Sequence, residues 1–65
     1  MKMDNNLQSC LTNALATTQE KVRDFMDYSN NIGDKKLSNF FKECAETEGH
    51  QARKLQGFID EYSQQ

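Results

Sequence analysis

The chain has 65 residues, no proline and three glycines, and its formal net charge is −2. A chain of this length forms one domain at most, here taken as residues 1–65, and is marginally stable alone. The lack of a basic cluster argues against nucleic acid as a partner. No apolar run approaches the ~20 residues that span a bilayer, and no apolar signal segment follows Lys2. We therefore expect no membrane partner and a cytoplasmic location.

The first helix is predicted over residues 4–30. Asp4, Asn5 or Asn6 caps its start, because short polar side chains accept hydrogen bonds from the free N–H groups there. Apolar, small and weakly polar residues recur at helical spacing. One face of this helix is predicted to carry Leu7, Leu11, Ala14, Leu15, Thr18, Val22, Phe25, Met26 and Ser29.

The turn is predicted over residues 30–34 and a second helix over residues 35–63. Asparagine and Gly33 tolerate the left-handed conformation that often ends a helix, and Asp34 is a good N-cap for the second helix. No segment alternates apolar and polar residues as a strand would. Two helices of similar length joined by a short turn predict an all-α, antiparallel two-helix hairpin.

The second helix has one unusual position, Glu48, in the middle of its apolar face. The other members of that face are Leu37, Phe41, Cys44, Leu55, Ile59 and Tyr62. The expected register places Ser29 near Leu37, Phe25 near Phe41 and Thr18 near Glu48. Because burying a bare carboxylate is costly, three interpretations stay open: a hydrogen bond to Thr18 or Gln51, a weak metal site, or exposure at a partner-binding surface. The metal site would use Glu48 and Gln51 oxygens to hold calcium or magnesium.

A single hairpin cannot cover both apolar faces, because each is wider than one neighbouring helix can bury. Pairing two hairpins as a homodimer gives a four-helix bundle that buries the remainder. Four further residues widen the apolar faces on one flank: Cys10, Tyr28, Phe40 and Phe58. The expected interface residues are Leu7, Leu11, Leu15, Val22, Phe25, Phe40, Phe41, Leu55, Phe58, Ile59 and Tyr62.

The remaining reactive side chains do not indicate an enzyme. In the hairpin, Cys10 and Cys44 lie about 18 Å apart along the axis, beyond disulfide reach. We interpret both as half-buried thiols, with a bond between two chains left open. His50 is expected to point to solvent, and no nucleophile–base pair can be placed.

The segment from Asp34 to Ile59 resembles the second helix of rubrerythrin and ferritin-like hairpins. The family pattern is F-x-E-x-A-E-x-E-x-x-H-A-x-x-L, and the matching residues are Phe41, Glu43, Ala45, Glu46, Glu48, Gln51, Ala52 and Leu55. The start at Asn6–Leu7 and the turn also fit, so the likeness covers nearly the whole chain. The chain is also similar to small uncharacterised two-helix proteins of spore-forming bacteria.

The ferritin-like resemblance implies a Glu-x-x-His metal motif on the second helix and a further glutamate on the first. Glu48 occupies the glutamate position, but Gln51 replaces the histidine, and Ala14, Leu15 or Thr18 replaces the other glutamate. An amide is a poor substitute for imidazole at iron or zinc. We therefore expect a non-enzymatic hairpin without a cofactor that acts through self-association and protein contacts. The alternatives are a metal-binding or redox protein centred on Glu48, and an inhibitor or adaptor of a larger protein.

Overall fold

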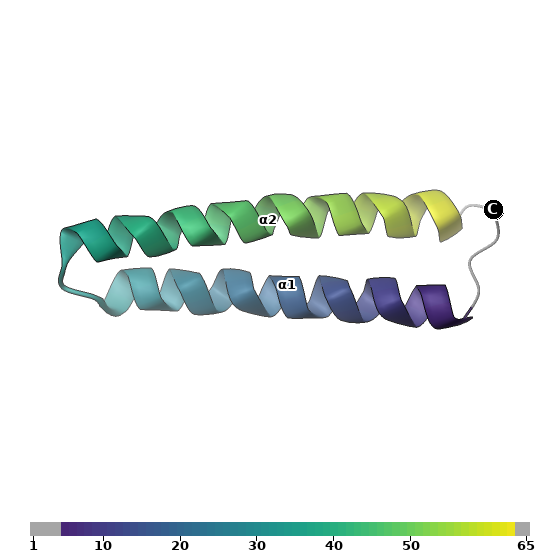
Figure 1. The fold of residues 1–65 in the computed structure, drawn as a ribbon, viewed down its shortest axis with the longest axis horizontal. Coiled ribbons are helices and arrows are strands. Elements are labelled where there is room, and N and C mark those ends of the chain that lie inside the picture. The colour runs from purple at the N-terminus through teal and green to yellow at the C-terminus, as the bar shows by residue number, and fades with distance from the viewer. Residues whose placement is uncertain (1–4, 64–65) are drawn as a thin grey trace.

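The computed structural model describes residues 5–63, which form two α-helices, α1 (Asn5–Asn31) and α2 (Lys35–Ser63). The helices lie side by side and antiparallel, with a tight turn at one end (Figure 1). The Cα atoms extend over 48 × 15 × 10 Å. Residues 5–63 contain no strand, so the predicted all-α hairpin is confirmed.

The predicted N-cap of α2 is confirmed. The Oδ1 atom of Asp34 accepts a hydrogen bond of 3.0 Å from the backbone N–H of Leu37, which satisfies one of the free donors of the first turn. At the start of α1, Asn5 and Asn6 already lie within the helix, and Asp4 lies outside the described residues.

The end of α1 differs from the prediction. The helix continues to Asn31, and its side-chain amide donates a 2.7 Å hydrogen bond to the carbonyl of Asp27. No residue within 5–63 has a positive φ, so the expectation of a left-handed helix end at Asn or Gly33 is wrong. Instead, the Asn31 side chain turns back along the last turn of α1 and hydrogen-bonds to the backbone four residues earlier.

Two serines fix the register of the helices near the turn. Ser29, 8% exposed, donates from its hydroxyl to the Ser38 carbonyl at 2.9 Å, and the Ser38 hydroxyl donates to the Ser29 carbonyl at 2.7 Å. The expected pairing of Ser29 with Leu37 is therefore wrong by one residue. The expected pairing of Phe25 with Phe41 is confirmed, since their rings stack. A residue of α1 and a residue of α2 thus lie at the same height along the hairpin axis when their numbers add up to about 67.

We predict that Ser38→Ala lowers the free energy of unfolding by about 1–2 kcal/mol, because it removes a hydrogen bond to a largely buried carbonyl. The double variant Ser29→Ala/Ser38→Ala should cost less than the sum of the two single variants, because the hydroxyls act as a pair. Urea unfolding followed by circular dichroism measures both values. The exposed Ser9→Ala serves as the control. Strict additivity of the two single variants would contradict the paired arrangement.

The most buried apolar side chain at the helix contact is small, and the predicted apolar face of the second helix did not include it. Ala45 is 4% exposed and is the only buried hydrophobic residue of the described chain. Gly49 and Ala52 follow it by four and seven residues, on the same face of α2. Glu48 lies about 60° around the helix from Ala45, so it stands beside the contact line rather than on it.

Because small residues occupy the contact line, the hairpin leaves its larger apolar side chains partly uncovered. No large side chain among residues 5–63 is fully buried. The chain exposes 5075 Å² of surface. A folded monomeric protein of the same mass is expected to expose about 4,250 Å², which leaves an excess of roughly 800 Å².

Candidate interaction surface

Four aromatic rings form a cluster beside the turn. The Phe25 ring stacks on Phe41 with centroids 6.1 Å apart, and Tyr28 meets Phe41 edge-on at 5.5 Å. Phe40 packs edge-on against Phe41 at 5.7 Å but stays 55% exposed. The cluster therefore joins α1 to α2 and at the same time presents aromatic surface to the outside.

A second apolar cluster lies toward the open end of the hairpin on α2. Phe58 stacks on Tyr62 with centroids 6.3 Å apart and is 47% exposed. It follows Phe40 by 18 residues, which is five full helical turns, so both rings point in the same direction about 27 Å apart. Three further apolar pairs of α2 repeat at this spacing: Leu37 and Leu55, Phe41 and Ile59, and Cys44 and Tyr62.

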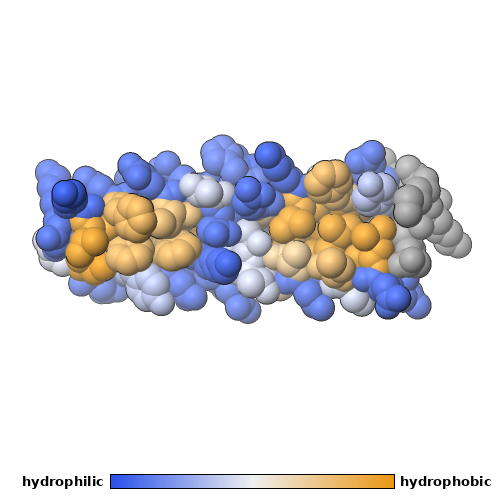
Figure 2. Space-filling model, viewed as in Figure 1, coloured by the Kyte–Doolittle hydropathy of each residue, from blue (hydrophilic) through white to orange (hydrophobic). Residues whose placement is uncertain are grey.

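These residues define one side of the molecule, which we call the aromatic flank: Phe25, Tyr28, Leu37, Phe40, Phe41, Cys44, Leu55, Phe58 and Tyr62. Of the five exposed large hydrophobic residues within 5–63, four lie on this flank, and Met26 does not. Figure 2 shows a face of the hairpin with the same pattern, in which hydrophobic side chains gather near the turn and near the open end. A band of hydrophilic side chains separates the two areas.

Glu48 belongs to the polar middle of the aromatic flank. It is half-buried and lines a shallow hollow with Phe25, Phe40, Cys44 and neighbouring polar residues of α2. The carboxylate has no hydrogen bond or ion pair within residues 5–63. The interpretation that Glu48 bonds to Thr18 is wrong, since the Thr18 hydroxyl donates to the carbonyl of Ala14 at 2.7 Å.

The predicted metal ligands do not form a closed site within one chain. Gln51, three residues after Glu48, is exposed and carries no imidazole or thiolate. Across residues 5–63, no three histidine, cysteine, aspartate or glutamate side chains are grouped closely enough to hold a metal ion. Within a single hairpin, Glu48 and Gln51 would offer a cation two oxygen ligands on one side only.

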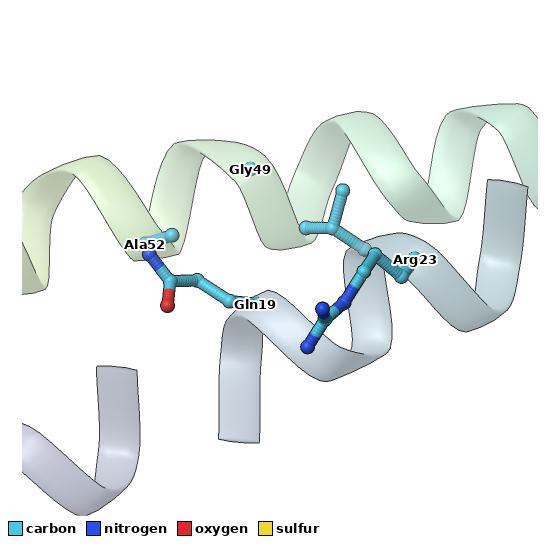
Figure 3. Close-up of a pocket in the computed structure, with 5 residues that line it drawn as sticks. Gln19, Arg23, Gly49 and Ala52 are labelled. Carbon is cyan, nitrogen blue, oxygen red and sulfur yellow. The ribbon is translucent and has the colours of Figure 1, made fainter. Parts of the chain in front are cut away.

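The opposite flank is charged and nearly flat. Figure 3 shows Gln19 and Arg23 of α1 beside Gly49 and Ala52 of α2, around a shallow open hollow that Val22 also lines. A neighbouring hollow on this flank is bordered by Met26 and by charged and polar residues of α2, namely Glu46, His50 and Arg53. Among the described residues, Met26 is the one exposed large apolar side chain on this flank, which therefore offers little apolar area for docking.

The predicted interface residues divide into two groups. Phe40 and Phe58 are exposed on the aromatic flank as expected. The half-buried members of the predicted set are Leu7, Leu11, Leu15, Val22, Phe25, Phe41, Leu55, Ile59 and Tyr62. Tyr28 and Leu37, each 49% exposed, were not in that set. Their spacing of three residues from Phe25 and Phe40 was the signal that could have placed them there.

The cysteines and the histidine differ in how far they are exposed. Both thiols are free; Cys44 is half-buried as expected, whereas Cys10 is exposed. Cys10 therefore contradicts the interpretation of two half-buried thiols. His50 is exposed on the charged flank, as predicted.

Comparisons with known proteins found no matching family model, no similar curated protein and no similar solved structure. Neither α1 nor α2 has an apolar stretch that could cross a membrane. The aromatic flank is accordingly the feature of the described residues from which a function can be argued.

Proposed function

We propose that this protein is a non-enzymatic helical hairpin that works through protein–protein contacts, the first of which is its own pairing into a four-helix bundle. The observation that supports it is the aromatic flank, where Phe40 and Phe58 are about half exposed on a hairpin with one buried apolar residue in its described part. Clusters of exposed apolar side chains on a small protein are typical of an interaction site.

The size of this surface agrees with the proposal. A face 48 Å long and 15 Å wide has an area of roughly 700 Å², and covering it on two copies would bury about 1,400 Å², within the range of stable interfaces. This area also matches the excess of roughly 800 Å² that the hairpin exposes compared with a folded monomer of its mass.

The ferritin-like resemblance adds a hypothesis about the ancestry of this chain. Hairpins of that family pair into four-helix bundles, and this chain has the helical hairpin without the family's histidine at position 51. We propose that the bundle geometry was kept while the metal chemistry was not. Metal analysis of protein purified without chelators tests this, and one or more bound metal ions per dimer would contradict it.

We predict that the purified chain is a dimer at micromolar concentration. Size-exclusion chromatography with light scattering measures the molar mass, and sedimentation equilibrium measures the dissociation constant. The helicity and the melting temperature should both rise with protein concentration, because association stabilises the folded hairpin. A well-folded monomer with a concentration-independent melting temperature would overturn the proposed function.

A further inference from the structure

We propose that two copies dock through their aromatic flanks with both turns at the same end, so that Glu48 of each copy pairs with Lys21 of the other. This inference rests on the proposed self-association and adds the orientation of the partner and the contacts that select it. It follows from where the charged residues lie on the flank, because the apolar residues alone permit more than one orientation.

Lys21 lies on the aromatic flank of α1. It precedes Phe25 by four residues and Tyr28 by seven, and these spacings place the three side chains on one face of a helix. By the observed register, Lys21 is level with residues 46–47 of α2. It therefore stands within about 3 Å of the level of Glu48 along the hairpin axis.

Neither charge is neutralised within its own chain. Lys21 is exposed, Glu48 is half-buried, and neither makes an ion pair or a hydrogen bond within residues 5–63. Each copy thus presents an unpaired cation on α1 and the unpaired Glu48 anion on α2 at nearly the same level. A second copy related by a two-fold axis along the hairpin would place each cation beside the partner's anion.

In this orientation α2 of each copy lies on the partner's α1. Each residue lies at the same height along the long axis of the dimer as the same residue of the partner. Phe40 then meets the partner's Tyr28, Gln51 meets the partner's Thr17, and Phe58 meets the partner's Cys10. Each of these pairs has residue numbers that add up to 68, close to the register within one hairpin. Near the turns an aromatic ring therefore covers an aromatic ring, near the open ends Phe58 covers the Cys10 thiol, and the polar middle meets the partner's polar middle.

The other symmetric docking, with the turns at opposite ends, places α2 on the partner's α2. Its apolar clusters also match, because Phe40 would meet the partner's Phe58. However, this docking brings the two Glu48 carboxylates close together and leaves Lys21 level with residues 15–17 of the partner, where no acidic residue lies. Like charges facing each other in an interface cost several kcal/mol, so the position of Glu48 favours the docking with the turns together.

The orientation of the two copies is tested by the distance between their turns. A spin label is attached at Gly33→Cys in a Cys10→Ala/Cys44→Ala background whose dimerisation is first verified. Gly33 is exposed and an added side chain meets nothing within 4 Å. Pulsed electron paramagnetic resonance should give a label-to-label distance under about 30 Å when the turns are together. With the turns at opposite ends, the length of the helices predicts more than about 40 Å.

The ion pair is tested by exchanging its charges. Lys21→Glu and Glu48→Lys should each raise the dimer dissociation constant by about tenfold or more, and the double variant should return to within about threefold of the original chain. Glu46→Lys makes the same charge change on the opposite flank and should leave the constant unchanged. Circular dichroism of each variant verifies that the hairpin is folded.

The outcomes separate this inference from the proposed function. A monomeric parent chain would overturn both. A dimer with the long label distance would overturn the docking and leave self-association intact. A short distance without rescue by the charge exchange would overturn the ion pair, whereas a short distance with rescue supports the whole inference.

Discussion

The variant Phe40→Glu/Phe58→Glu should be monomeric under conditions where the original chain is a dimer. Full burial of a phenylalanine contributes about 1.5–3 kcal/mol, and the two rings are 55% and 47% exposed in the hairpin. Covering four such half-exposed rings in a dimer therefore contributes about 4 kcal/mol, and its loss raises the dissociation constant about a thousandfold. Sedimentation equilibrium measures this change.

The matched control is Met26→Glu. Met26 is also an exposed large hydrophobic residue, at 37%, but it lies on the charged flank beside Glu46 and Arg53. The same kind of substitution there should leave the dissociation constant unchanged. If Phe40→Glu/Phe58→Glu stays dimeric while Met26→Glu dissociates, the interface lies on the charged flank and the aromatic flank has another role.

The second large effect is expected from Gly49→Ala/Gly57→Ala. Both glycines lie inside α2, neither has a positive φ, and a Cβ added at either meets nothing within 4 Å. Glycine in a helix interior costs up to about 1 kcal/mol relative to alanine, because more backbone freedom is lost on folding. The double variant should therefore gain about 1–2 kcal/mol, or about 10 °C in melting temperature for a chain of this size.

Thermal unfolding by circular dichroism at matched protein concentration measures this gain. Ala52→Gly makes the reverse change in the same helix and should lower the melting temperature. The melting temperature of Gly49→Ala also tests whether the charged flank is covered in solution, because Gly49 borders both hollows of that flank. A lower melting temperature for Gly49→Ala alone would mean that another copy or another protein fills that space in solution.

Much of the fold followed from local sequence signals. The absence of proline, the helical spacing of apolar residues and the capping side chain of Asp34 set two helices and one turn, and the start of α2 was predicted correctly. Equal helix lengths and a short turn were sufficient for the antiparallel hairpin. These features depend on neighbours within one or two turns, which sequence patterns record directly.

The rotation of α2 about its own axis was decided only by tertiary packing. The apolar residues of α2 cover a stripe centred near Glu48, and from that stripe alone the centre was expected to face α1. In the structure Ala45 and Gly49 are turned toward α1 instead. The small Ala45 side chain is the most buried apolar group at the helix contact, and the rings of Phe40 and Phe58 lie to one side of it.

This rotation is what creates the candidate site. It moves Glu48 to the edge of the helix contact, leaves Phe40 and Phe58 uncovered, and joins them with Tyr28 on one flank. The sequence by itself determined which residues form helices and that one hairpin has more apolar surface than it can cover. Only the packing of the two helices decided how much of each side chain on the aromatic flank stays exposed, because exposure depends on which residues, here Ala45, fill the helix contact and not on periodicity.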